Sequence, residues 1–316
     1  MSSLKSDFFF INSLKKIKKE DWNACVDDDH PFIQYEFLFA LEESESACSQ
    51  TGWKPYHYIE YNDVNEIIAI CPLYIKSHSY GEYIFDHAWA DAYHRHGLNY
   101  YPKLQSAIPF TPVTGERIFI SKKIKNKKDK IKAIINNIIG EAKKLNVSSA
   151  HFNFIKNPNE WDAEEPIMIR EGIQFHWENN NYKSFDNFLS TLSSRKRKQI
   201  KKERECLKNN NLKVKLLSGD DLQKEDLVFF YECYLDTTER KWGSTYLKKE
   251  FFMNILKHFK DKVLLMIAYQ NNTKVASALN FLSKTHLYGR LWGSKFEVPY
   301  LHFELCYYQA IDYAIA

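Results

Sequence analysis

Residues 89–115 read WADAYHRHGLNYYPKLQSAIPFTPVTG. The stretch is crowded with Tyr, His, Asp, Arg and Pro, and its apolar residues follow neither the two-residue period of a strand nor the 3.6-residue period of a helix. Ordinary connecting loops are shorter and poorer in aromatic residues. A long irregular segment with many aromatic and hydrogen-bonding side chains is typical of the wall of a binding site. We therefore expect residues 89–115 to be irregular and to line a ligand groove.

On both sides of this stretch, the apolar residues predict two halves of similar build. In the first half we expect strands at residues 7–11, 54–61, 66–76, 117–121 and 149–154, and helices at residues 17–25 and 127–145. A further helix, which carries Phe37, Leu38 and Leu41, is expected after residues 30–32. In the second half we expect strands at residues 172–178, 212–216, 263–269, 275–282 and 285–292, and helices from residue 184 and at residues 226–240, 247–258 and 301–315.

This order of elements predicts an α+β protein of two domains, at residues 1–156 and 172–316. Each domain is expected to have a mixed, largely antiparallel sheet flanked by helices. A length of 316 residues also exceeds what one hydrophobic core usually serves. The last helical pattern reaches Ala316 without a C-terminal cap, so we expect a C-terminally truncated chain with an incomplete second domain.

The amino-acid composition indicates which kinds of protein this chain can be. Aromatic residues make up 16% of the chain, which favours aromatic-lined grooves as well as a core. The six cysteines include no CxxC pair, so neither a disulfide scaffold nor a structural zinc site is expected. The first residues lack a signal-peptide pattern, and the longest apolar stretches are strand-sized. We expect a cytoplasmic protein without a transmembrane segment; the sequence does not predict its oligomeric state.

Eight unusual strings carry a resemblance to a known family. They are TGWKPYH (51–57), PLYIKSHSYGEYIFDHAWADAY (72–93), YYPKL (100–104), PFTPVTG (109–115), SRKRKQIKKER (194–204), DTTERKWG (236–243), LYGRLWG (287–293) and HFELCYYQAIDYAI (302–315). Together they make the chain resemble the bacterial FemAB-like family of predicted N-acyltransferases, named for peptidoglycan biosynthesis. The resemblance covers nearly the whole chain.

The resemblance implies two GNAT-like domains, arranged as in the Fem peptidyl transferases. Better-known relatives of those proteins move amino acids from aminoacyl-tRNA onto peptidoglycan precursors. Many GNAT enzymes bind the CoA pyrophosphate with a Q/R-x-x-G-x-G/A loop, and residues 293–303 (GSKFEVPYLHF) contain no such loop. The absence favours aminoacyl-tRNA over acyl-CoA as the co-substrate, without deciding between them. No tightly bound cofactor is expected.

The first candidate site lies in the opening stretch and around PFTPVTG. Its backbone amides and threonine hydroxyls could hold a carboxylate or phosphate, although a rigid structural loop explains the same residues. The substrate-binding candidates here are Asp86, Trp89, Asp91, Tyr93, Phe110, Thr111 and Thr114. Asp91, His94 and His96 could also be read as metal ligands, but their spacing matches no strong zinc signature, and no metal is expected.

The second candidate site is a run of four basic residues near the start of a predicted helix. Such a run could bind tRNA phosphates or an acidic carrier, and a solvated helix face is the alternative. The residues are Arg195, Lys196, Arg197 and Lys198. Residues 122–132 hold seven lysines in eleven positions, and there we favour a solvated face.

The third candidate site combines residues 240–242 with a strand. On an alternating strand Tyr288, Arg290 and Trp292 share one face, where an arginine between two rings could bind a carboxylate or phosphate. A structural arginine over an aromatic cluster is the alternative. The further substrate-binding candidates are Arg240, Lys241 and Trp242.

The fourth candidate site is catalytic. Transfer of an acyl group to an amine needs a base for the amine and a donor for the tetrahedral oxyanion. His302 or Glu304 could be that base, with Tyr308 as the donor or as an acid. Near a helix N-terminus, Glu304 also suits a purely structural role.

We therefore expect an acyltransferase acting on amine groups. Its partners would be an activated acyl donor, either aminoacyl-tRNA or acyl-CoA, and an amine acceptor such as a peptidoglycan precursor or peptide, with no role for DNA. We expect the first stretch to form one wall of a groove that faces Arg240 and Arg290. The competing hypotheses are a non-catalytic protein that binds a cell-wall or peptide ligand in the same groove, and an RNA-binding protein that uses the basic helix.

Overall fold

The computed structural model describes residues 7–26, 30–158, 161–241 and 245–316, apart from the side chain of Lys241. The chain divides into two compact units. Unit 1 contains Met1–Glu171 and Tyr246–Phe251, and unit 2 contains Gly172–Thr245 and Phe252–Ala316. Both units combine helices with largely antiparallel sheets, so the predicted α+β class is confirmed. Within the described ranges, no helix is both long and apolar enough to cross a membrane.

Unit 1 contains two four-stranded sheets. The first is antiparallel, with the order β1 (Asp7–Ile11), β3 (His57–Tyr61), β4 (Ile67–Cys71) and β7 (Phe119–Ile120). The second has the order β2 (Trp53–Pro55), β5 (Tyr74–Lys76), β6 (Lys103–Ser106) and β8 (Ala150–Phe152). In the second sheet only β6 and β8 are parallel.

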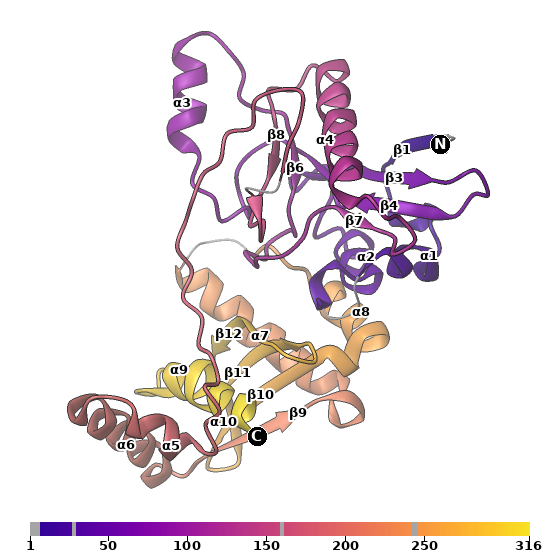
Figure 1. Ribbon diagram of the computed structural model, residues 1–316. Coiled ribbons are helices and arrows are strands. Elements are labelled where there is room, and N and C mark those ends of the chain that lie inside the picture. The colour runs from indigo at the N-terminus through magenta and orange to yellow at the C-terminus, as the bar shows by residue number, and fades with distance from the viewer. Residues whose placement is uncertain (1–6, 27–29, 159–160, 242–244) are drawn as a thin grey trace. The chain divides into compact units, whose positions relative to one another are not determined.

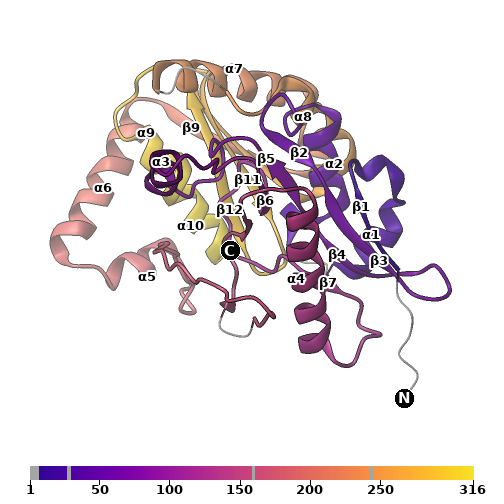
Figure 2. The same ribbon diagram turned by 90° about the horizontal axis from the view of Figure 1, so that it is seen from above.

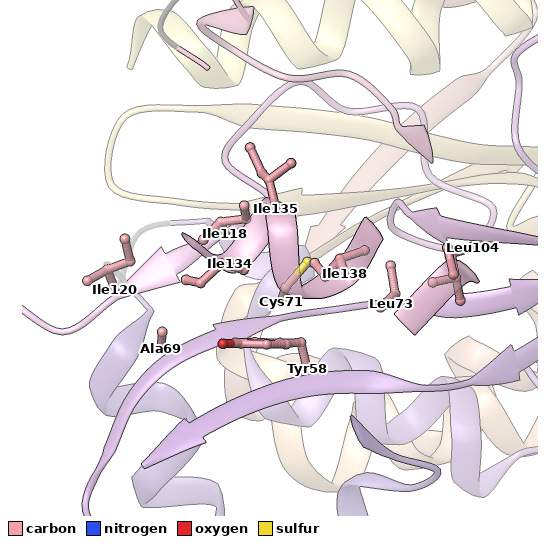
Figure 3. Packing of buried hydrophobic residues seen from close by; sticks show 11 residues of the cluster. Tyr58, Ala69, Cys71, Leu73, Leu104, Ile118, Ile120, Ile134, Ile135 and Ile138 are labelled. Atoms are coloured by element: carbon pink, nitrogen blue, oxygen red, sulfur yellow. The ribbon is translucent and has the colours of Figure 1, made fainter. Parts of the chain in front are cut away.

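The core of unit 1 lies between these sheets and the amphipathic helix α4 (Lys127–Lys144). The Asn126 side chain caps this helix by accepting a hydrogen bond from the Asp129 backbone N–H. Figure 3 shows Ile134 and Ile138 of α4 close to Cys71 of β4. The helices α1 (Lys19–Cys25) and α2 (Tyr35–Glu43) complete the unit together with α3 (His87–Arg95).

Unit 2 is built on one antiparallel sheet. Its order is β12 (Leu287–Ser294), β11 (Thr273–Leu282), β10 (Val263–Gln270) and β9 (Leu212–Leu217). The predicted meander of β10, β11 and β12 is confirmed, and Asn271 and Asn272 make its first turn with positive φ angles. The helices are α5 (Phe185–Ser190), α6 (Ser194–Asn209), α7 (Lys224–Lys241), most of α8 (Lys249–Phe259), α9 (Leu301–Phe303) and α10 (Gln309–Ile315), with a π-helical turn, η6 (Glu304–Tyr308), between the last two.

The sheet of unit 2 is covered on both faces. Figure 2 shows α7 on one side and α9 and α10 on the other. A side chain at Gly293 of β12 would place its Cβ 2.2 Å from the Cys233 backbone oxygen of α7. The missing side chain therefore lets the helix lie directly on the strand.

Several of the predicted elements are wrong. Residues 54–61 and 66–76 were each expected to form one strand, but each range covers two strands of different sheets, β2 and β3 in the first and β4 and β5 in the second. Residues 89–115 are not irregular throughout, because they contain β6 and most of α3 (Figure 1). None of the nine residues of α3 is buried, so the helix places no face in the core. Residues 172–178 form no strand and are almost all exposed. The single helix predicted from residue 184 is two helices, because the Ser193 side chain caps a new helix by accepting a hydrogen bond from the Lys196 N–H.

Candidate functional site

Four ionisable side chains are buried together in unit 1: Lys76, Glu82, Asp86 and Lys103. The Lys103 Nζ lies 2.6 Å from Asp86 Oδ2 and 2.9 Å from Glu82 Oε2. The Tyr100 hydroxyl donates to Asp86 Oδ2 at 2.9 Å, and the Tyr101 hydroxyl donates to Asp86 Oδ1 at 3.2 Å. Residues from two of the family strings, 72–93 and 100–104, therefore meet in one network.

The second sheet of unit 1 places these lysines side by side. Lys76 of β5 is the direct antiparallel partner of both Trp53 on β2 and Lys103 on β6. Directly opposite residues of antiparallel strands project from the same face of a sheet. Ile75 and Leu104 alternate with the lysines and belong to the core under α4. One face of the sheet is therefore apolar, and the other carries a buried polar surface.

Burial shifts the ionisation of the network. Desolvation lowers the pKa of Lys76 to about 7, although the negative charge of Glu82 opposes the shift. Desolvation raises the pKa of Glu82 above its usual range. Burial also acts to raise the pKa of Asp86, but the hydrogen bond and charge of Lys103 outweigh it and hold that pKa below the usual range. At neutral pH, Lys76 can therefore take up or release a proton.

The structure separates the predicted groove residues of unit 1. Asp86, Phe110 and Thr111 are buried. The Phe110 ring stacks on Tyr246 at 5.1 Å and packs edge-on against Trp53 at 5.6 Å.

The other predicted groove residues are more accessible. Trp89 and Asp91 are exposed on α3, and Thr114 is exposed in the loop. Tyr93 is half-buried against the Tyr100 ring. Because both carboxylate oxygens of Asp86 are hydrogen-bonded inside unit 1, its role there is to hold the network.

In unit 2, the predicted catalytic residue Glu304 is held by side chains from α6 and α10. Its Oε1 accepts from Arg204 Nη2 at 3.0 Å and from Gln309 Nε2 at 2.7 Å. The same Arg204 nitrogen lies 2.8 Å from Asp312 Oδ2, and the guanidinium stacks over the Phe185 ring. The buried Oε2 of Glu304 has no hydrogen-bond partner among the described residues. Glu304 begins a π-helical turn, a feature often found at functional sites.

The other two predicted catalytic residues lie in different surroundings. Tyr308 is buried, and its hydroxyl donates to Glu203 Oε2 at 2.5 Å. Burial raises the pKa of Tyr308, and the hydrogen bond to Glu203 adds to the shift. His302 is exposed, and its ring packs against Trp292 at 5.2 Å. Tyr308 therefore keeps its proton, and His302 belongs to an aromatic contact at the surface.

The prediction that Tyr288, Arg290 and Trp292 share one face is wrong. Leu279 of β11 pairs with Leu291, but Asn280 pairs with Gly289, so Arg290 is an extra residue in β12. A bulge of one residue reverses the alternation of side chains beyond it. Tyr288 consequently lies on the face of Phe281, whereas Trp292 lies on the opposite face with Ala278.

The remaining predicted residues of unit 2 are on helices. Arg240 bonds to Asp236 Oδ2 at 3.0 Å and to the Ser294 backbone oxygen at 2.7 Å. The side chain of Lys241 and all of Trp242 lie outside the described residues. In α6, the basic residues Arg195, Lys196 and Lys198 are exposed, and Arg197 is half-buried.

Sequence reasoning missed most of the buried network. Lys76, Glu82 and Lys103 are not among the sequence candidates, and Arg204 lies in the basic string 194–204 without a predicted role of its own. The available signal was a lysine in each of two aromatic-rich strings, YIK and YYPK. That signal becomes specific only once the strands are paired. Within the described ranges, no group of three His, Cys, Asp or Glu side chains is placed to hold a metal ion.

Fold and site define a mixed α+β protein with a buried polar centre in unit 1 and a clamped glutamate in unit 2. The chain belongs to the FemAB-like family, described as peptidoglycan biosynthesis/recognition, whose model matches residues 13–316. No curated protein matches the chain.

Several solved structures are similar in part. The L-PGS of Bacillus licheniformis is 8% identical, with a TM-score of 0.48, over 94% of this chain and 72% of that chain. The C-terminal domain of a protein assigned as a lysylphosphatidylglycerol synthetase, from Agrobacterium fabrum, is 8% identical, with a TM-score of 0.49, over 94% and 75%. A conserved protein of unknown function from Bacteroides thetaiotaomicron is 9% identical, with a TM-score of 0.49, over 95% and 85%. At these values the likenesses carry no argument about activity.

Proposed function

We propose that this protein is an N-acyltransferase or aminoacyltransferase that moves an acyl or aminoacyl group onto an amine of a peptidoglycan precursor or peptide. The observation that carries the proposal is membership of a peptidoglycan biosynthesis/recognition family across residues 13–316. Two GNAT-like domains are part of the proposal, supported by an antiparallel sheet flanked by helices in each unit. In the same proposal the protein acts in the cytoplasm.

The chemistry of amine acylation requires a proton acceptor beside the nucleophile. The amine nitrogen attacks the donor carbonyl carbon, the bond from that carbon to the ester oxygen or thioester sulfur breaks, and one proton leaves the nitrogen. In our proposal, Glu304 Oε2 orients the amine, accepts this proton and then gives it to the departing oxygen or sulfur. The contacts of Arg204 and Gln309 with Oε1 support this role, since they fix the carboxylate while leaving Oε2 without a partner among the described residues.

Two other residues keep roles in the proposal. His302 is the second candidate base, favoured by its exposure. Tyr308 is the candidate oxyanion donor, although it would first have to exchange its hydrogen bond with Glu203. The remaining candidates at Arg240, Lys241, Trp242, Arg290 and Trp292 stay as proposed substrate contacts.

The donor is either aminoacyl-tRNA or acyl-CoA, and both carry phosphates. Arg195, Lys196 and Lys198 are exposed on one turn of α6 and offer positive charge for such phosphates. The protein would bind either donor as a co-substrate.

The test is turnover by the full chain with labelled aminoacyl-tRNA and with labelled acyl-CoA, each with an amine acceptor. We expect transfer from one donor, and we expect Glu304→Gln to lower kcat at least about 100-fold with folding intact. The exposed Glu66→Gln is the matched control and should keep full activity. Transfer that survives Glu304→Gln and fails in His302→Gln would move the base to His302.

A second candidate function is recognition without chemistry. The family description names recognition beside biosynthesis, which favours this alternative over an unrelated activity. Saturable binding of a peptidoglycan precursor, with no transfer from either donor, would establish it. Binding of tRNA that weakens steeply with salt, again without transfer, would instead support the RNA-binding alternative.

A further inference from the structure

The polar face of the second sheet in unit 1 carries hydrogen-bonding groups that nothing in the described chain satisfies. Tyr74 and Gln105 are direct cross-strand partners and fully buried. The Tyr74 hydroxyl, both amide atoms of Gln105 and Glu82 Oε1 have no hydrogen-bond partner among the described residues. Lys76 is two positions from Tyr74 on the same face. Tyr74, Gln105 and Lys76 are neighbours, because opposite and alternate residues on one sheet face lie side by side. Glu82 joins them through Lys103, which lies 2.9 Å from Glu82 Oε2 and is the cross-strand partner of Lys76.

The two lysines of this region differ in their ion pairs. Lys103 contacts both buried carboxylates, whereas no carboxylate of the described chain lies within ion-pair distance of Lys76. The Lys76 ammonium donates to the Tyr80 backbone oxygen at 3.2 Å and lies 3.8 Å from the Trp53 ring centre. It has three donors, so it can bond further acceptors. An acceptor is therefore needed near Lys76, and a donor is needed near Glu82 Oε1.

The sum of charges selects the kind of ligand. When Lys76 is protonated, two ammonium groups (Lys76 and Lys103) face two carboxylates (Glu82 and Asp86), so a ligand with zero net charge keeps the interior neutral. A phosphate would add charge close to two carboxylates and is disfavoured in a buried site. A small molecule with one carboxylate and one ammonium matches both unmet needs.

We propose that this face of unit 1 is a binding site for a free α-amino acid. Its carboxylate would accept hydrogen bonds from Lys76, the Tyr74 hydroxyl and Gln105 Nε2. Its ammonium would donate to Glu82 Oε1 and Gln105 Oε1. Buried polar groups without partners destabilise a protein, and this ligand pairs them. The inference does not rest on the proposed transfer activity, because binding is measured without a donor.

The experiment is calorimetric titration of the full chain with the common free amino acids, together with thermal unfolding. We expect saturable binding and a rise in Tm for at least one of them. Its N-acetyl derivative and its methyl ester should each bind at least about tenfold more weakly, since the first offers no ammonium to Glu82 Oε1 and the second offers no carboxylate to Lys76. A dipeptide, in which the two charges lie on different residues, should also bind more weakly.

Two variants separate ligand binding from folding. Tyr74→Phe and Gln105→Met remove groups that have no partner in the described chain, so the free protein should be as stable as the parent or more stable. Both should weaken amino-acid binding at least about tenfold. Tyr61→Phe on β3 and the exposed Gln50→Met are the matched controls and should bind normally. The proposal is overturned by absence of binding for every amino acid, by equal binding of the blocked derivatives, or by undiminished binding to both variants.

Discussion

Arg204 and Glu304 are 100 positions apart in the chain, yet the Arg204 guanidinium lies 3.0 Å from Glu304 Oε1. The contact joins α6 to the π-helical turn before α10, and the same guanidinium bonds Asp312 at 2.8 Å. One cation therefore holds two acidic side chains of the last helical segment. Both residues lie in family strings, so the relationship links two signatures that are far apart in sequence.

Removing the guanidinium should destabilise unit 2. Arg204→Met leaves Glu304 buried without its cation, and because Arg204 is partly exposed we expect a loss of about 2 kcal/mol in the free energy of unfolding. Arg195→Met on the same helix replaces an exposed side chain and should change it by less than about 0.5 kcal/mol. Urea unfolding measures both. The double variant Arg204→Met with Glu304→Gln should regain part of the loss, and strict additivity would contradict the pairing.

Stability should rise with pH above neutrality because of Lys76. Its pKa is about 7 in the folded chain, below the usual value of 10.5, so the unfolded state binds more protons between pH 7 and 10.5. Stability therefore increases across that window. Lys76→Met should remove this rise, whereas the exposed Lys54→Met should keep it. Urea midpoints at several pH values are the measurement, and a rise that survives in Lys76→Met would contradict the assignment.

The stability of the folded chain should also depend on pH in the acid range, because of His151. Burial lowers the pKa of His151 to about 4, with a further contribution from the charge of Lys103. The unfolded histidine, with its usual pKa of 6.5, binds more protons between pH 4 and 6.5, so stability should fall as the pH drops through that range. His151→Gln should flatten this part of the curve, and His286→Gln, an exposed histidine, should not.

Two glycine substitutions should have opposite effects on stability. One is at the contact between α7 and β12, and the other is a control in α4. Gly293→Ala places a Cβ 2.2 Å from the Cys233 oxygen and should cost about 2 kcal/mol or more, because backbone must move. Gly140→Ala, in the middle of α4, meets nothing within 4 Å and should stabilise the helix by about 0.5–1 kcal/mol. Thermal unfolding distinguishes them. Equal effects would show that α7 does not lie on β12 at this distance.

The exposed turn of α6 predicts a salt effect. Replacing Arg195, Lys196 and Lys198 together by Gln should weaken tRNA binding and reduce the slope of log K against log salt by about 2 to 3. The same change at Lys125, Lys127 and Lys128, where a solvated face is favoured, should leave the slope unchanged. Equal changes in both variants would indicate binding to general positive charge.

Local patterns predicted much of the fold. The first strand, the meander and the amphipathic α4 follow from alternation, turn residues and 3.6-residue spacing within a few neighbouring positions. The sequence pattern does not predict α3, none of whose residues is buried, and it does not predict the break before α6, because an apolar stripe continues across it. The alternation of residues along β12 also does not predict the extra residue at Arg290, since a bulge is defined by the pairing with the partner strand.

The sequence by itself determined the family, the α+β class and the position of Glu304 in the last helical segment, because each of these is written in contiguous residues. Only the tertiary structure decided that Lys76 meets Lys103, that Glu82 and Asp86 share one lysine, and that Arg204 points to Glu304 instead of standing with the basic face. The physical reason is that burial and partner choice depend on strand register and on packing between distant segments. The same residue types in solvent would be ordinary surface charges.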